Sequence, residues 1–141
     1  MAEFVHVPLQ TVDDGDNVIF TDTVSHGPKC VFHRPDSGVV ILRGITNCCY
    51  ARYRVSFGGN LSIPVGGIVG PISVALAING EALGGSEAVV TPVAVGDEQH
   101  VYISTFVTVP RGCCFTVAVE NTSDQAIDVT NANLIVTREE G

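Results

Sequence analysis

The stretch from Glu98 to Asn121 constrains the fold more than any other part of the chain, because apolar residues recur in it at almost every second position. This period of two is typical of strands that have one face in a core. Pro110 and Gly112 stand between the two alternating runs, where a tight turn needs a preset φ and a residue that tolerates positive φ. The alternating apolar residues are Val101, Ile103, Val107, Val109, Phe115, Val117 and Val119. We therefore expect a β-hairpin here.

The second face of the first run, 98–109, is also unusual, because Tyr102 and Phe106 stand on it among polar residues. A strand with core residues on one face and aromatic residues on the other has two surfaces to bury.

Composition limits the class of protein. The 141 residues suffice for one domain with its own core. Hydrophobic residues make up 45% of the chain but aromatic residues only 6%, so the core must consist mostly of aliphatic side chains. The 15 glycines and 7 prolines favour short strands and turns over helices. With only 7 Lys+Arg and a net charge of -8, the chain lacks the basic footprint of a nucleic-acid-binding protein.

Targeting and redox features are sparse. The most apolar segment, 61–78, is interrupted by glycine and proline, so we expect no membrane span, and the first ten residues lack the pattern of a secretory signal. We expect synthesis in a cytosol.

The five cysteines form an odd set that includes two adjacent pairs. This favours free thiols over a disulfide framework, and the spacing is not that of a zinc finger. They are Cys30, Cys48, Cys49, Cys113 and Cys114.

The remainder of the chain reads as eight to ten strands separated by turns, without a helical period. The dipeptide Asn79-Gly80 after an apolar run predicts a two-residue hairpin turn. Near the end, Ala132, Leu134 and Val136 share one strand face, and Ile135 lies on the other. Strands at this spacing predict an all-β fold, an antiparallel sandwich of jelly-roll type.

Four runs also carry a family resemblance. They are A-R-Y-R-V-S-F, I-S-V-A-L-A-I-N-G, V-Y-I-S-T-F-V after a Gly-Asp turn, and N-A-N-L-I-V-T-R-E. Together they resemble the tumour necrosis factor-like jelly roll that is shared with complement globular heads, over about residues 17–138. The closest likeness is to the bacterial and phage branch, which includes head domains of collagen-like spore-surface proteins and phage head-decoration or head-fibre proteins. No Gly-X-Y collagen stalk stands before the domain.

The resemblance implies a homotrimer, because members of this family associate through the outer face of one sheet. A trimer would explain the apolar second faces of the strands. The alternative is that the aromatic residues cover a loop of their own subunit and the arginines are solvated. The expected trimer interface consists of Phe20, Arg52, Arg54, Tyr102, Phe106 and Ile135.

We expect residues 1–16 to precede the jelly-roll domain, which would span residues 17–141. The alternation in this first segment, with Phe4 and His6 on it, predicts an N-terminal arm that adds to another protein's sheet. The alternative is a strand that pairs within its own subunit or trimer.

We expect no enzymatic activity and no cofactor. The four histidines lie in separate segments, and no cupin-type metal triplet, nucleophile elbow or phosphate-binding loop occurs.

Two functions fit the resemblance to the tumour necrosis factor-like jelly roll. One is a structural decoration protein on a phage capsid, made in the host cytoplasm, with the major capsid protein or another virion component as partner. The other is a surface-binding module of a spore coat or adhesin that binds a host protein or glycan. Neither role involves nucleic acid or a membrane.

Overall fold

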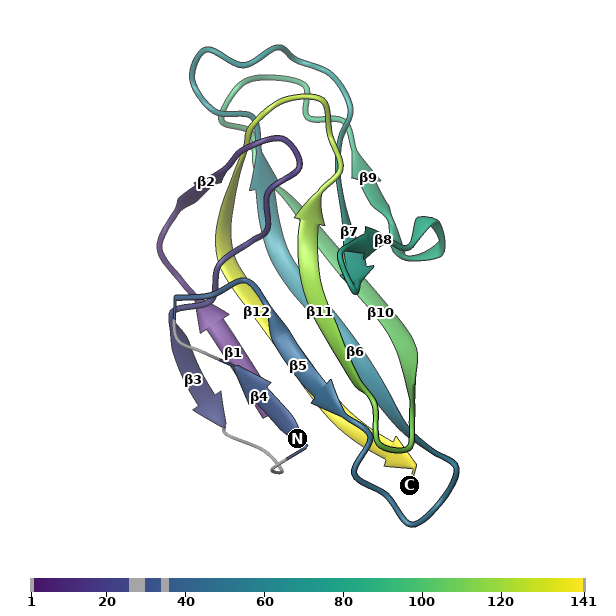
Figure 1. The fold of residues 1–141 in the computed structure, drawn as a ribbon. Coiled ribbons are helices and arrows are strands. Elements are labelled where there is room, and N and C mark those ends of the chain that lie inside the picture. Colours follow the sequence, from purple (N-terminus) through teal and green to yellow (C-terminus); the bar gives the residue numbers. More distant parts are fainter. Residues whose placement is uncertain (1, 26–29, 34–35, 141) are drawn as a thin grey trace.

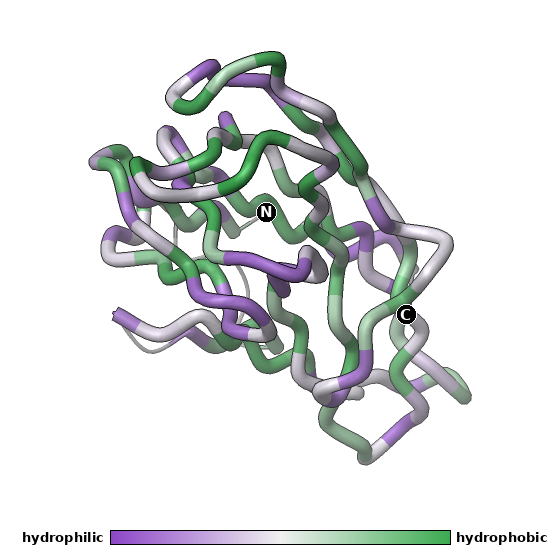
Figure 2. Tube along the Cα trace, turned by 90° about the horizontal axis from the view of Figure 1, so that it is seen from above, coloured by the Kyte–Doolittle hydropathy of each residue, from purple (hydrophilic) through white to green (hydrophobic). Residues whose placement is uncertain are grey.

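The computed structural model describes residues 2–25, 30–33 and 36–140, which fold into two antiparallel β-sheets packed face to face (Figure 1). The only helix among these residues is a short 3₁₀ turn, η1 (Gly84–Ser86). The all-β jelly-roll fold expected from the sequence is therefore confirmed. Apolar and polar segments alternate along the chain trace, as strands with one buried face require (Figure 2).

The first sheet, sheet A, has the strand order β10-β6-β12-β1-β3, and β2 pairs with the start of β12. Its three longest strands lie side by side, and β10 forms one edge. The strands are β1 (Ala2–His6), β2 (Gln10–Val12), β3 (Asp22–Ser25), β6 (Tyr50–Ser62), β10 (Gln99–Pro110) and β12 (Ile127–Glu140).

The second sheet, sheet B, has the order β4-β5-β11-β7-β8, and β9 pairs with β7. Its longest strands are shorter than the three longest strands of sheet A. The strands of sheet B are β4 (Val31–His33), β5 (Val40–Arg43), β7 (Ile72–Ile78), β8 (Glu81–Ala82), β9 (Ala88–Val90) and β11 (Cys114–Asn121).

The stretch 98–121 does not form the expected hairpin. The turn lies where the sequence places it, with Cys113 N donating to Pro110 O at 3.0 Å and Gly112 at φ 80°. However, β10 pairs with β6 in sheet A, whereas β11 pairs with β5 and β7 in sheet B. The chain thus crosses from one sheet to the other at this turn. Alternation shows that each strand has a core face, but it does not choose the strand's neighbours.

The hairpin expected at Asn79-Gly80 is confirmed. β7 and β8 pair directly on either side of it, and both turn residues have positive φ, 54° and 84°. This is the backbone that a type I′ turn requires.

The core lies between the two sheets and is mainly aliphatic. Its few aromatic members include Phe20, which is fully buried and packs edge-on against Phe57 with ring centroids 6.4 Å apart. The expectation that Phe20 belongs to a subunit interface is therefore wrong, because its side chain packs between the two sheets.

Tyr53 is also fully buried, and its hydroxyl donates to Arg43 O at 2.6 Å. Burial raises the pKa of this phenol.

The N-terminal segment is an integral part of sheet A and not a free arm. β1 pairs with β12 on one side and with β3 on the other. Phe4 is only 2% exposed, and its ring lies tilted against that of His33 with centroids 4.6 Å apart. His6 is half-buried, and its Nδ1 lies 3.0 Å from the Thr21 hydroxyl. Of the two alternatives for this segment, the structure has the strand that pairs within its own chain.

Candidate self-association surface

The outer face of sheet A, turned away from the core, carries most of the residues singled out in the sequence. β10 pairs with β6 along its length, and β6 pairs with β12 on its other side. The register places Phe106 opposite Arg54 and Ser104 opposite Ser56. Because side chains alternate between faces, outward residues of the three strands meet on one surface. This sheet-A surface comprises Arg52, Arg54, Ser56, Tyr102, Ser104, Phe106 and Ile135.

Phe106 is held between two cations. The guanidinium carbon of Arg52 lies 4.1 Å from the centroid of its ring, and that of Arg54 lies 5.1 Å away. Such contacts are worth about 0.5–1 kcal/mol each at exposed sites. The Arg54 Nε also lies 3.9 Å from a carboxylate oxygen of Glu139. The arginines thus lie against the ring while it stays 44% exposed.

Tyr102 stands next to a pair of serines on the same face. The hydroxyls of Ser56 and Ser104 are 3.1 Å apart, and both hydrogen-bond to the Tyr102 phenol and lower its pKa below the ordinary value. Across the strand pair, Tyr102 faces Gly58, where an added Cβ would lie 3.9 Å from the tyrosine ring. The ring is 66% exposed, so the largest side chain of the surface projects into solvent.

The strand that carries both aromatic residues is also an open edge. β10 is 12 residues long, and no described strand pairs with its free side. Long unpaired edges are sites at which another chain can add or pack, and proteins generally cover them. A partner that packs over β10 would cover the edge and the aromatic residues together.

The structure brings five of the six expected interface residues onto one face, with Phe20 as the exception. Ile135 is half-buried on β12, between Ser56 of β6 and Glu3 of β1. The sequence analysis missed Ser56 and Glu139, which complete the contacts of Tyr102 and Arg54. The alternation in 51–57 already placed Ser56 on the arginine face, but a serine by itself gave no reason to select it.

A second region of exposed apolar residues lies at one end of the sandwich, in the loops 63–71 and 91–97 (Figure 1). The loops are joined by a hydrogen bond from Gly96 N to Ile63 O, 3.0 Å long. Val65, Ile68 and Val93 are 97%, 79% and 85% exposed. We call these three residues the apolar loop tip.

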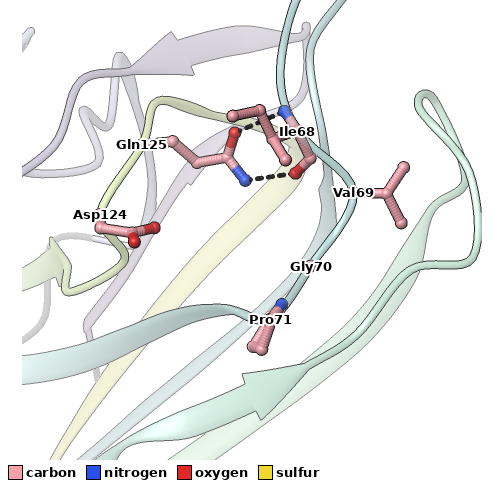
Figure 3. Close-up of a pocket in the computed structure, with 6 residues that line it drawn as sticks. All are labelled: Ile68, Val69, Gly70, Pro71, Asp124 and Gln125. Carbon is pink, nitrogen blue, oxygen red and sulfur yellow. Dashed lines mark hydrogen bonds between the residues drawn. The ribbon is translucent and has the colours of Figure 1, made fainter.

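The loop 63–71 is held in a defined shape by one side chain. The Gln125 amide accepts from Ile68 N at 2.9 Å and donates to Ile68 O at 2.7 Å (Figure 3). Beside this clamp lies an open pocket of about 280 Å³ with the Asp124 carboxylate near it (Figure 3). Val65 and Ile68 therefore lie on a loop that Gln125 holds, and Val93 lies on the neighbouring loop that is bonded to it through Gly96.

No group of three or more potential metal ligands occurs among the described residues. The three histidines that the structure describes lie apart and have different partners: His6 contacts Thr21, His33 contacts Ser37 O and His100 contacts Asn60. Within the same part of the chain, no helix has the length and apolar character that crossing a bilayer requires.

Comparison with known proteins identifies the fold class. No family model matches the chain, and no curated protein matches its sequence. Among solved structures, murine APRIL at pH 5.0 superposes with a TM-score of 0.68 over 98% of both chains at 10% identity. The globular domain of zebrafish complement 1qA gives a TM-score of 0.53, covering 95% of this chain and 94% of that one at 11% identity. The chain therefore has the jelly-roll fold of tumour necrosis factor-like and complement globular domains.

Proposed function

We propose that this chain is a non-enzymatic structural protein that assembles as a homotrimer through the sheet-A surface. The observation that carries the proposal is the pair of exposed aromatic residues, Tyr102 and Phe106, on a long strand with an open edge. Buried at a subunit contact, each aromatic side chain contributes about 2 kcal/mol, and a trimer has three such contacts. The arginines that flank Phe106 add planar donors of the kind that are enriched at protein interfaces.

We further propose that the trimer decorates a phage capsid, with the major capsid protein or another virion component as its partner. This role rests on the resemblance of the sequence to small phage head-decoration proteins. A three-fold assembly suits such a role, since closed symmetric oligomers match symmetry points of a larger shell.

The trimer is tested by the double variant Tyr102→Asp/Phe106→Asp, measured by light scattering coupled to size exclusion. We expect wild type at micromolar concentration to have three times the chain mass and the variant to be monomeric, because both aromatic rings are lost from the contact and charged groups take their place. The matched control is Phe32→Asp. Phe32 lies on β4 of sheet B, is also 44% exposed and also has an arginine, Arg43, over its ring at 5.7 Å.

The control should remain trimeric. A monomeric wild type, or equal dissociation by both variants, would overturn the trimer. A circular dichroism spectrum with strand content unchanged in the double variant distinguishes lost association from lost folding.

The capsid role is tested separately by adding purified protein to phage heads that lack it. We expect the protein to co-sediment with heads at a saturating stoichiometry in multiples of three. Failure to bind heads, together with an intact trimer, would remove the capsid role and leave the assembly untouched.

The apolar loop tip favours a second candidate function, a surface-binding module of a spore coat or adhesin. Ordered loops with exposed apolar side chains are typical of sites that contact another protein. The triple variant Val65→Ser/Ile68→Ser/Val93→Ser should then stay trimeric but lose binding to spores or host surfaces. Binding to phage heads by this variant at wild-type affinity would show that the loop tip is not the capsid contact.

A further inference from the structure

Four of the five cysteines gather at one end of the sandwich, opposite the apolar loop tip. Cys48 and Cys49 lie in the loop between β5 and β6, and Cys113 and Cys114 lie at the turn between β10 and β11 (Figure 1). All four are exposed and free, whereas Cys30 is free but buried in the core. We call the two segments, 43–50 and 110–114, the thiol end.

The two segments form one platform, because their backbones are hydrogen-bonded to each other. Gly44 N donates to Cys113 O at 2.8 Å, and Arg111 N donates to Cys49 O at 3.0 Å. Gly112 N in turn donates to Gly44 O at 3.1 Å. The segments approach so closely that a Cβ at Gly44 would lie 2.1 Å from Pro110 O. The two segments are therefore held side by side, with the four cysteines on them exposed.

All four thiols of the thiol end are free in the structure. The Cα atoms of adjacent residues are about 3.8 Å apart, whereas disulfides usually need about 4.4–6.8 Å. Neither Cys48 with Cys49 nor Cys113 with Cys114 therefore makes an ordinary disulfide. Between the two segments, the backbone bonds hold the loops in an arrangement in which all four thiols stay free and exposed.

We infer that the thiol end is a covalent cross-linking site that joins this chain to a second copy of itself. Every copy presents two thiol pairs on two segments of the same end, so two copies that meet there bring complementary groups together. Each copy also has enough thiols to bond to more than one neighbour. This site is separate from the sheet-A surface, and the inference does not rest on the trimer or on the capsid role.

The bond would form by thiol–disulfide exchange with a small disulfide such as glutathione disulfide. A cysteine thiolate of one copy attacks the disulfide, forms a mixed disulfide and releases one glutathione thiolate. A thiolate of the second copy then attacks the protein sulfur and releases the other. Two protein thiols lose two electrons and two protons, which reduce the reagent to two glutathione thiols. Arg43 and Arg111, with no carboxylate in either segment, attract this anionic reagent.

The experiment treats the full-length protein with glutathione disulfide and separates it on a denaturing gel without reductant. We expect covalent dimers and larger species that dithiothreitol returns to monomers, and mass spectrometry should identify peptides 43–50 and 110–114 as the linked partners. Mixing isotopically light and heavy protein before oxidation should give linked light–heavy peptide pairs.

The matched control is the quadruple serine variant of Cys48, Cys49, Cys113 and Cys114, which retains buried Cys30. It should give monomers only. The double variants Cys48→Ser/Cys49→Ser and Cys113→Ser/Cys114→Ser should give mainly dimers. Each variant keeps the thiols of only one segment, and one segment contacts one neighbouring copy at a time. Disulfides confined to one chain, glutathione adducts without linked chains, or cross-links in the quadruple variant would each overturn the inference.

Discussion

The outer faces of the two sheets differ, although both sheets present similar apolar residues to the core. On sheet A the outward positions of β10 carry Tyr102 and Phe106. On sheet B the outward positions of β7 and β11 carry Ala75, Ala77 and Ala118, which are at most 6% exposed. Small side chains leave nothing to insert into a partner, whereas the aromatic residues of sheet A project. Strands of similar inner pattern thus give one face suited to association and one that is not.

The two faces also differ in how they place cations. On sheet A two arginines converge on one ring, Phe106, in the middle of an edge strand. On sheet B a single arginine, Arg43, lies over Phe32 on a three-residue strand. The proposal of an interface on sheet A therefore does not rest only on an exposed aromatic residue with a cation, since sheet B has one too. The position of that residue within a wide, continuous face matters as well.

The strongest test of the distinction between core and surface is Phe20→Ala. We expect it to lower the free energy of unfolding by about 3–5 kcal/mol, since it leaves a cavity between the sheets. Phe32→Ala, at the exposed rim, should cost less than about 1 kcal/mol. Chemical denaturation followed by circular dichroism measures both. If Phe20→Ala instead left stability intact and dissociated the oligomer, Phe20 would belong to the interface after all.

A charge at the centre of each outer face compares the faces directly. Ser104→Arg on sheet A should weaken association by at least about a hundredfold, because burying an unpaired charge costs several kcal/mol and each 1.4 kcal/mol is tenfold. Thr116→Arg, outward on β11 of sheet B, should leave the oligomer unchanged. Sedimentation equilibrium measures the two constants. Equal effects on both faces would contradict the assignment of the interface to sheet A.

Removing the cations sharpens the comparison further. Arg52→Ala/Arg54→Ala should weaken association by about tenfold, because the Phe106 ring would then be ordered only on association, which costs about 0.5–1.5 kcal/mol per side chain. Arg43→Ala, which removes the corresponding contact on sheet B, should have no effect on association. Tighter association of the double variant would mean that the arginines repel between subunits.

The smallest effect concerns tyrosine ionisation. Hydrogen bonds from Ser56 and Ser104 lower the pKa of Tyr102, whereas burial raises that of Tyr53. In an ultraviolet titration at a dilution where the chain is monomeric, Tyr102 should therefore ionise before Tyr53 as the pH rises. Ser56→Ala/Ser104→Ala should move the Tyr102 transition upward and leave that of Tyr53 in place. A Tyr102 transition that stays unmoved would show that the serines do not stabilise the phenolate.

Much of the architecture could be predicted from the sequence, because it depends on local patterns. The alternation in 98–121 and 129–137 identified which side chains enter the core, and Asn79-Gly80 identified a hairpin turn. Periodicity also placed the two arginines and the two aromatic residues outward on neighbouring strands. These features follow from the geometry of a strand, in which every second residue faces the same way.

Pairing and burial were decided by the tertiary structure. The same alternation in β10 and β11 fits a hairpin or a crossing between sheets, and only the packing of β6, β5 and β7 selected the crossing. Phe4 and Phe20 are buried by residues further along the chain, because His33 packs against both rings and Phe57 packs against Phe20. The cysteines at the thiol end, 65 residues apart, meet because two loops close the same end of the sandwich. Strand periodicity is local, whereas contacts between sheets depend on the path of the whole chain.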